Sequence, residues 1–189
     1  MRLKSKISNI AVAIGAALIA TNATTANVAT DYSDHAGDKA ELSQADFQKQ
    51  LLDAHNEERL RVGVKPLVWD NKLSLDAQKW ADHLAKNDLF EHANDTQDGE
   101  NLWMGDSAAY SPNEMVGLWI SEVKLFKYGV FPKVSKSADW TDVGHYTQLI
   151  WPTTSKLGCA KTRGGGNDFL VCRYDPAGNV SGFPLRKTA

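Results

Sequence analysis

The sequence predicts an α+β protein, a three-layer α-β-α sandwich with helices on both sides of a mostly antiparallel central sheet. Three stretches with helical spacing of apolar residues come first, and a strand-like stretch and a symmetric hairpin follow them. The chain has 189 residues, of which 42% are hydrophobic and 23% are charged. That length and composition are sufficient for one hydrophobic core.

The first 26 residues have the build of a secretory signal peptide. Three basic residues precede an apolar run at residues 10–20, and small residues follow it. The run is much shorter than the roughly 20 residues that a membrane span needs. We therefore expect residues 1–26 to be a signal peptide cleaved near residues 23–29, with an uncleaved N-terminal anchor as the alternative. The protein is then secreted or extracytoplasmic (periplasmic in a Gram-negative bacterium) and not transmembrane.

Residues 31–41 are polar and charged, which is typical of a flexible leader, so we expect a leader at residues 27–43 and a folded domain at residues 44–189. Loss of residues 1–26 removes three of the 21 basic residues and none of the 23 acidic ones, leaving a net charge of −5. This negative balance argues against a protein that binds nucleic acid.

Two helices are expected in the first half of the domain. Ser43 and Asp46 form a helix start, apolar residues from Phe47 onward recur at helical spacing, and Gly63 ends the run. A second helix follows Pro66. Its expected buried stripe consists of Leu73, Ala77, Trp80 and Leu84.

A third helix begins in "SPNEMVGLWISEVKLF", with Ser111 as the cap, Pro112 at the first position and Glu114 completing a capping box. Before it, residues 100–104 are expected to form a short strand. After it, the stretch "DVGHYTQLIWPTTSKLGCA", residues 142–160, predicts a β-strand over Thr147–Trp151 that opens with Gly144 and His145. Strand alternation would place His145 on the same face as Leu149 and Trp151.

The two cysteines, Cys159 and Cys172, lie in a symmetric hairpin that turns about Gly165 and Gly166. This register places the two cysteines directly opposite each other, within the separation that a disulfide requires. In an exported protein we expect a Cys159–Cys172 bridge, and two buried free thiols are the alternative.

Glu122 shares the helix face of Met115 and Trp119, where a carboxylate needs a partner. His92 and Glu100 lie in turn-rich sequence, so these two residues, Glu122 and His145 could meet in one pocket. Spacing alone leaves other interpretations open, because no HExxH motif is present. His92 and Glu100 could be solvated loop residues, and Lys124 or a backbone amide could neutralise Glu122.

Three stretches carry a family resemblance: "HNEERLRVGVKPLVWDNKLSLDAQKWADHLA", "GHYTQLIWPTTSKLGCA" and "FLVCRYDPAGNV". They resemble the signatures of the CAP superfamily of cysteine-rich secretory proteins, antigen 5 allergens and plant pathogenesis-related class 1 proteins. The resemblance runs from about Leu51 to Pro184 and implies an α-β-α sandwich. It also implies a cleft tetrad whose members are His92, Glu100, Glu122 and His145. The other histidines, His35, His55 and His83, are expected to lie in the leader, between helices and on the second helix.

The tetrad implies a weakly held Zn²⁺ or other divalent cation, with His92 and His145 as metal ligands. Glu100 and Glu122 would then act through bound water or orient the ligands, and they are the only candidate catalytic residues. The resemblance implies a binding module for a lipid, a sterol or an extracellular protein, or alternatively a metal-dependent protease or esterase. The resemblance implies that such a protease would use a serine near the tetrad. The loop after His92 has no serine, and Ser121 is expected on the far side of its helix from Glu122. We therefore favour the binding module.

Aromatic residues could supply an apolar surface beside the cleft for such a partner, although packing in the core is the alternative. They are Trp103, Tyr110, Trp119, Phe126, Tyr128, Phe131 and Trp140.

Overall fold

A computed structural model describes residues 42–94 and 96–187 of the chain. The expected signal peptide, His35 and almost all of the expected leader lie outside the described residues, so those expectations stay predictions. No helix in the described part is both long enough and apolar enough to cross a membrane.

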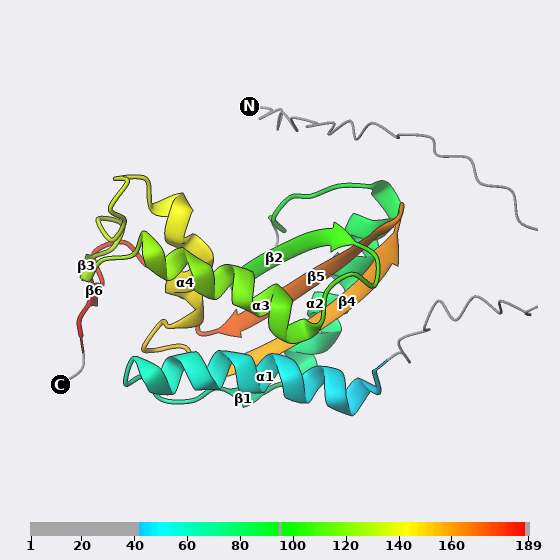
Figure 1. Ribbon diagram of the computed structural model, residues 1–189, viewed down its shortest axis with the longest axis horizontal. Helices are drawn as coiled ribbons and strands as arrows, with labels where there is room; N and C mark the ends of the chain where they lie inside the picture. The colour runs from blue at the N-terminus through cyan, green and yellow to red at the C-terminus, as the bar shows by residue number, and fades with distance from the viewer. Residues whose placement is uncertain (1–41, 95, 188–189) are drawn as a thin grey trace, which may run out of the picture. The chain divides into compact units, whose positions relative to one another are not determined.

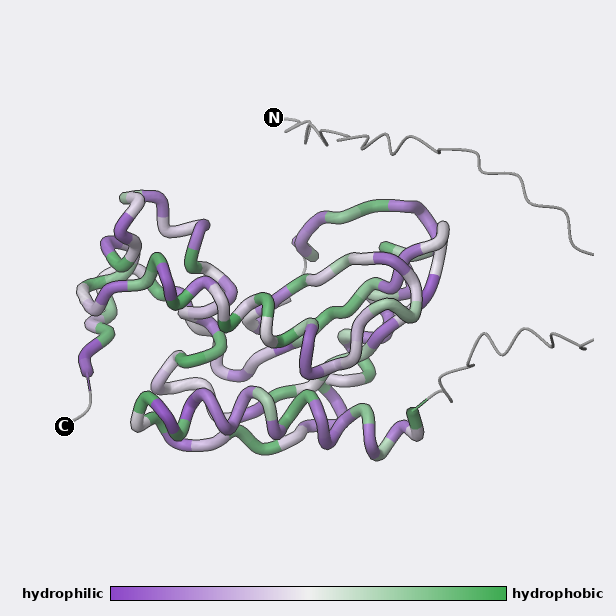
Figure 2. The backbone as a smooth tube through the Cα atoms, in the orientation of Figure 1, coloured by the Kyte–Doolittle hydropathy of each residue, from purple (hydrophilic) through white to green (hydrophobic). Residues whose placement is uncertain are grey.

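The first helix, α1 (Gln44–Arg61), begins where the sequence predicts. The Oγ atom of Ser43 accepts a hydrogen bond from the backbone N–H of Asp46 at 3.1 Å, which caps the first turn. Beyond the helix, Gly63 adopts a φ of 74°, a conformation that favours glycine. Polar and apolar residues alternate along α1 in Figure 2, and its buried face carries Phe47, Leu51 and His55.

The second helix, α2 (Asn71–Asn87), follows the two-residue strand β1 (Val68–Trp69). Asp70 caps it, because its Oδ1 accepts hydrogen bonds from the backbone N–H groups of Lys72 and Leu73. Trp80 was expected in the buried stripe, but it is only half-buried and donates its Nε1–H to the carbonyl of Glu91. The small side chain of Ala81 takes its place in the stripe, which comprises Leu73, Ala77, Ala81, Leu84 and Ala85.

The central sheet has the strand order β1-β4-β5-β2. β4 (Lys156–Gly164) pairs antiparallel with β5 (Asn167–Asp175), and β5 pairs antiparallel with β2 (Gly99–Asp106). Only β1 is parallel to its neighbour, so the sheet is mixed but mostly antiparallel. β2 contains the expected strand at residues 100–104 and extends it at both ends.

The β4–β5 hairpin confirms the expected disulfide. Gly165 and Gly166 form its turn with φ values of 59° and 85°, which a residue with a Cβ rarely adopts. Cys159 lies opposite Cys172 in the register and is bonded to it. No free cysteine remains in the sequence, so the alternative of two buried thiols is excluded.

The helices cover the sheet in two layers (Figure 1). On one face, α1 and α3 (Pro112–Ser121) pack over a core that includes Leu51, Trp119 and the disulfide. On the other face, α2 packs over a smaller core that includes Leu84 and Phe169. The α+β, α-β-α prediction is therefore confirmed, and so is the capping box of Ser111 and Glu114 at the start of α3.

The expected strand at Thr147–Trp151 is wrong. A 3-10 helix, η2 (Trp140–Val143), leads directly into the short helix α4 (Gly144–Leu149). Residues 146–151 are all buried, so the alternation of a half-buried strand is absent. Local β-propensity from β-branched and aromatic residues did not decide this segment, because its tertiary contacts favour a helix.

The buried side chain of Arg59 holds the end of this segment through tertiary hydrogen bonds. Its Nη1 donates to the carbonyls of Leu149 and Trp151, and its Nη2 donates to that of Thr154. These carbonyls belong to the end of α4 and the turn after it, where helical bonding leaves acceptors unpaired. Burial lowers the pKa of Arg59 to about 10, so the guanidinium stays charged at neutral pH.

Two further short elements follow α3. The 3-10 helix η1 (Glu122–Lys124) places Glu122 just beyond the α-helix rather than inside it as expected. The strands β3 (Gly129–Val130) and β6 (Pro184–Leu185) then form a separate two-stranded sheet.

Candidate functional site

His145 and Glu122 form the first of two histidine–glutamate pairs. The Nδ1 of His145 lies 2.6 Å from Oε1 of Glu122, and the backbone N–H of Tyr146 donates to Oε2 at 2.9 Å. Glu122 begins η1 and His145 lies in the first turn of α4, so one carboxylate joins two short helices. A backbone amide does help to neutralise Glu122, as one of the sequence-based alternatives proposed, and the imidazole is its second partner.

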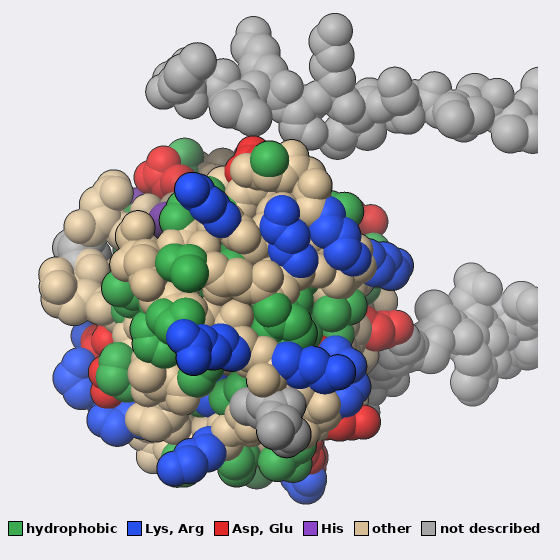
Figure 3. All heavy atoms as spheres, turned by 90° about the vertical axis from the view of Figure 1, so that its left-hand side faces the viewer, with side chains coloured by type: hydrophobic (Ala, Val, Ile, Leu, Met, Phe, Trp, Pro, Cys, Tyr) green, Lys and Arg blue, Asp and Glu red, His purple; other side chains and the backbone are tan. Residues whose placement is uncertain are grey.

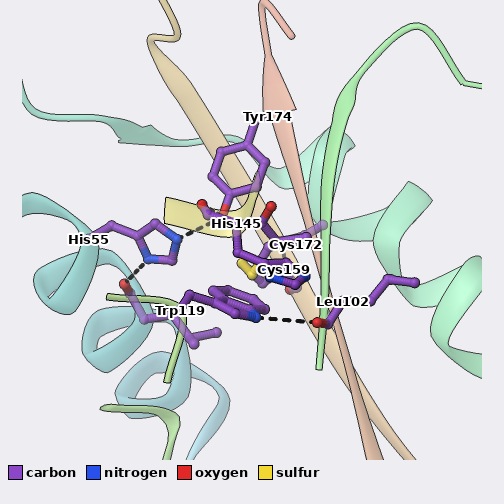
Figure 4. Close-up of a disulfide and its surroundings, with 10 residues drawn as sticks. His55, Leu102, Trp119, His145, Cys159, Cys172 and Tyr174 are labelled. Atoms are coloured by element: carbon purple, nitrogen blue, oxygen red, sulfur yellow. Dashed lines mark hydrogen bonds between the residues drawn. A yellow bond between two sulfur atoms is a disulfide. The ribbon is translucent and has the colours of Figure 1, made fainter. Parts of the chain in front are cut away.

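The ring of His145 also stacks on the ring of Trp119, with centroids 5.9 Å apart and planes 13° from parallel. Trp119 is itself held in place, because its Nε1–H donates to the carbonyl of Leu102 in β2 (Figure 4). His145 is thus oriented by a hydrogen bond at Nδ1 and by a ring face, while Nε2 makes no hydrogen bond to the described residues.

His92 and Glu100 form the second pair. Nδ1 of His92 lies 2.6 Å from Oε1 of Glu100, and the backbone N–H of Ala93 donates to the same oxygen at 3.1 Å. The side chain of Glu100 is only 6% exposed, whereas that of His92 is 63% exposed. A buried carboxylate therefore orients an imidazole that faces solvent.

Arg173 completes the second pair, and sequence reasoning missed it. It lies opposite Glu100 in the β2–β5 register, is 4% exposed, and brings its Nη2 to 3.0 Å from Oε2 of Glu100. This contact is a close ion pair without hydrogen-bond geometry. It compensates the charge of Glu100, but the Nε and Nη1 donors of Arg173 have no hydrogen-bond partner among the described residues. The signal that could have identified Arg173 is its position: it is a charged residue directly after Cys172, in a strand that is buried on both faces.

A buried chain of hydrogen bonds runs from α1 through the sheet to α4, and Figure 4 shows its first part, from α1 through His55 to Tyr174. The Nδ1 of His55 bonds the carbonyl of Leu51 at 2.7 Å, and its Nε2 lies 2.8 Å from the hydroxyl of Tyr174. Since a carbonyl only accepts, Nδ1 is the donor and Nε2 accepts from Tyr174. The two N–H bonds of the Asn101 amide go to the Tyr174 hydroxyl and to the carbonyl of His145.

This chain has two consequences. Desolvation lowers the pKa of His55 to about 4, so His55 is a neutral structural histidine between α1 and α3, as predicted. Asn101, next to Glu100 in β2, connects the strand of one histidine–glutamate pair to the helix of the other. The backbones that carry the two pairs are thereby joined by one side chain.

A hollow of about 400 Å³ lies between α1 and α3. Tyr146 connects it to the His145 pair, because its hydroxyl donates to Oε1 of Glu58 at 2.8 Å and Glu58 also accepts two hydrogen bonds from Arg61. Burial raises the pKa of Tyr146, so its hydroxyl keeps this proton. The hollow is lined by Asp53, Ala54, Glu57, Glu58, Arg61, Asn113 and Ile120.

Each pair can offer a cation one imidazole nitrogen. In a neutral histidine whose Nδ1–H donates to a carboxylate, Nε2 carries the free lone pair that binds a metal. Across residues 42–94 and 96–187, however, no three His, Cys, Asp or Glu side chains gather around one metal position. The described residues therefore do not form a closed four-ligand zinc site.

The candidate serine nucleophile, Ser121, makes its hydrogen bond within its own helix and not to either pair. The Oγ of Ser121 donates to the carbonyl of Leu118 at 2.7 Å, one helical turn back, and the residue is exposed.

The expected aromatic residues divide between core and surface. Trp103, Trp119, Phe126 and Phe131 are buried, whereas Tyr110, Tyr128 and Trp140 remain about 40% exposed.

The fold and the two pairs place this chain in the class of α-β-α sandwich proteins that have carboxylate-oriented histidines beside the sheet. The sequence profile described as "CAP: Cysteine-rich secretory protein family" matches residues 52–174, so the chain is a member of the CAP family. Curated relatives support this. The chain is 34% identical to pathogenesis-related protein PR-1 of Medicago truncatula over 76% of this chain and 82% of that protein. It is 35% identical to pathogenesis-related protein 1C of Nicotiana tabacum over 71% and 78%.

Solved structures share the fold. NaASP2, crystallised with Zn²⁺, superposes with a TM-score of 0.64 and 23% identity over 78% of this chain and 88% of that one. A hookworm platelet inhibitor gives a TM-score of 0.64 and 21% identity over 80% of each chain. At these identities the likeness shows the fold alone.

Proposed function

We propose that this CAP-family protein is a secreted binding module that holds a divalent cation weakly through His92 and His145. It binds a small lipid or an extracellular protein partner beside these residues. One observation carries the proposal: in each pair a carboxylate accepts a hydrogen bond from Nδ1–H, which leaves the lone pair of Nε2 for a ligand. The same arrangement is common around metal-binding histidines, where the carboxylate sets the tautomer.

Binding is favoured over catalysis because each pair offers a cation only one imidazole, and no hydroxyl or thiol of the described residues is hydrogen-bonded to either pair. Catalytic zinc usually has three protein ligands and an open position, and covalent catalysis needs an activated nucleophile. Binding requires less, namely a concave surface with a few polar anchors. The hollow between α1 and α3, which Tyr146 joins to the His145 pair, supports such a role.

Secretion is part of the same proposal. The disulfide between Cys159 and Cys172 is consistent with an oxidising compartment. The family description and the expected signal peptide agree with export.

Zinc titration tests the cation. Because NaASP2 was crystallised with Zn²⁺, this is the first ion to try. We expect isothermal titration calorimetry to show weak zinc binding by the wild-type protein. The double variant His92→Ala/His145→Ala should bind zinc with at least tenfold lower affinity, since both proposed ligands are gone. His83→Ala is the matched control, because the exposed ring of His83 contacts only residues of its own helix α2, namely Trp80 and Asn87, in the described structure. Equal affinities in the wild type and the double variant would place the ion elsewhere.

A turnover screen on the same preparations decides between the binding module and the metal-dependent hydrolase. Peptides and esters are incubated with the zinc-loaded protein, and lipid retention is measured in parallel. We expect lipid retention without turnover. Turnover that Glu122→Gln abolishes and His83→Ala preserves would replace the binding module with a hydrolase in which Glu122 acts as the base.

A further inference from the structure

We propose that the side of the protein formed around β3 and β6 docks on the surface of an anionic lipid bilayer. This β3–β6 surface comprises residues 124–136, Trp140 and residues 185–187. It does not depend on the His/Glu pairs or on the cation proposed for them.

The β3–β6 surface carries a positive charge that the whole chain does not have. Residues 124–138 contain four lysines and no acidic residue, although the full chain has a net charge of −2. Arg186 and Lys187 follow β6 directly. Since β6 runs antiparallel to β3, these two residues continue toward the stretch that precedes Gly129.

The four lysines are available to an external partner. All four are exposed, and within the described residues none of them lies in an ion pair with a carboxylate. Lys136 donates from Nζ to the carbonyl of Lys124, which holds the ammonium at the surface without neutralising it. The lysines are Lys124, Lys127, Lys133 and Lys136.

Large apolar side chains lie among these cations. Leu125 and Tyr128 are each 42% exposed, Val130 is 51% exposed and Trp140 is 40% exposed. Figure 3 looks onto this side of the molecule and shows hydrophobic side chains interleaved with Lys and Arg, with most Asp and Glu toward the edge. Cations and apolar groups therefore share one surface rather than separate ones.

The surface is also preorganised. Tyr128 packs edge-on against buried Phe126 at 5.1 Å between centroids, and Trp140 packs against buried Phe131 at 5.2 Å. The backbone is paired as well, since the N–H of Lys127 donates to Val134 and that of Lys136 donates to Leu125. Rings held in this way lose little conformational entropy when they bind.

An anionic bilayer matches this combination better than a soluble polyanion does. Lysines near an anionic membrane surface each add to affinity, and Tyr, Trp and aliphatic side chains are favoured at the level of the lipid headgroups. A soluble polyanion would reward the lysines but leave the apolar side chains in water. Asp139 and Asp142 lie next to Trp140, so we place the centre of docking at Lys127, Tyr128 and Val130.

Vesicle co-sedimentation tests the proposal. The probes are vesicles of phosphatidylcholine alone and of phosphatidylcholine with about 30% phosphatidylglycerol. We expect binding to the anionic vesicles only, and a marked loss of binding between about 0.05 M and about 0.5 M salt, because salt screens exposed charges. Lys127→Gln/Lys133→Gln should weaken binding about 25-fold, from roughly fivefold for each lysine. The control Lys79→Gln/Lys86→Gln makes the same charge change on α2 and should bind as the wild type does.

A second variant, Tyr128→Ser/Val130→Ser, separates the bilayer from a soluble polyanion. It should lose vesicle binding and keep its retention on a sulfated-polysaccharide column, since only the bilayer contacts apolar groups. Binding that is equal on neutral and anionic vesicles, or insensitive to salt, would contradict the proposal. Retention of the wild type on the column without vesicle binding would assign the surface to a soluble polyanion instead.

Discussion

His55 and His145 lie toward opposite ends of one hydrogen-bonded chain, yet their environments prepare them for different roles. His55 is completely buried, and both of its ring nitrogens are used, by Leu51 and Tyr174. His145 is partly exposed, and its Nδ1 is bonded to Glu122 while Nε2 is left over. Desolvation makes the first histidine a neutral core residue, and a single carboxylate makes the second a candidate ligand.

The buried neutral state of His55 predicts a pH-dependent stability. In the unfolded chain His55 takes up a proton near pH 6.5, whereas in the folded protein its pKa is about 4. The unfolded state therefore binds more protons between these values, and the free energy of unfolding should fall as the pH drops from 6.5 to about 4. The loss attributable to His55 is about 3 kcal/mol, and urea unfolding across this range measures it.

Two variants isolate the contribution of His55. His55→Gln cannot take up the proton, so its unfolding free energy should depend less on pH between 6.5 and 4 than that of the wild type. His83→Gln removes an exposed histidine on α2 and should retain the wild-type slope. Identical slopes for His55→Gln and the wild type would mean that other groups carry the acid sensitivity.

Among the elements, the β4–β5 hairpin has the firmest basis in the sequence and α4 has the weakest. The hairpin is local, since a glycine turn sets the register and the register places Cys159 opposite Cys172. The helix α4 depends on distant residues, because Glu122 bonds its first turn and Arg59 bonds its last carbonyls. Register follows from turn chemistry, whereas a six-residue helix is too short to be stable by propensity alone.

The disulfide should stabilise the hairpin and with it the whole domain. Cys159 and Cys172 are 13 residues apart, and closing a loop of this size contributes about 2–3 kcal/mol in the chain-entropy picture. We expect Cys159→Ala/Cys172→Ala to lose at least that much unfolding free energy in urea. Alkylation of the denatured wild-type protein without reductant checks the bond itself. Labelling of two thiols would show that packing alone holds the hairpin.

At the scale of the whole molecule, one sheet separates two unequal cores. The core under α1 and α3 contains the disulfide and most of the large aromatic side chains, while the core under α2 is built largely from alanines. The His145–Glu122 pair borders the core under α1 and α3, because His145 stacks on Trp119. Glu100 and its partner Arg173 lie on the face of the sheet that α2 covers. The candidate site therefore draws on both sides of the sheet.

The expected signal peptide gives a prediction for the whole chain. Intact-mass measurement of protein recovered outside the cytoplasm should show the loss of about 23–29 residues, because signal peptidase cleaves after small residues. Ile14→Asp/Leu18→Asp breaks the apolar run and should keep the protein inside the cell. A full-length mass in the exported fraction would favour the uncleaved anchor.

Local patterns in the sequence determined the caps of α1 and α3, the β4–β5 register, the disulfide and the α-β-α order of layers. They also picked out His92, Glu100, Glu122 and His145, although the family resemblance was needed to group them, and their function stays a prediction. The tertiary structure alone decided that residues 144–149 are helical, that Arg173 is paired with Glu100, and that Asn101 joins the two pairs. These features depend on groups distant in sequence, and buried polar atoms obtain partners only when the chain is folded.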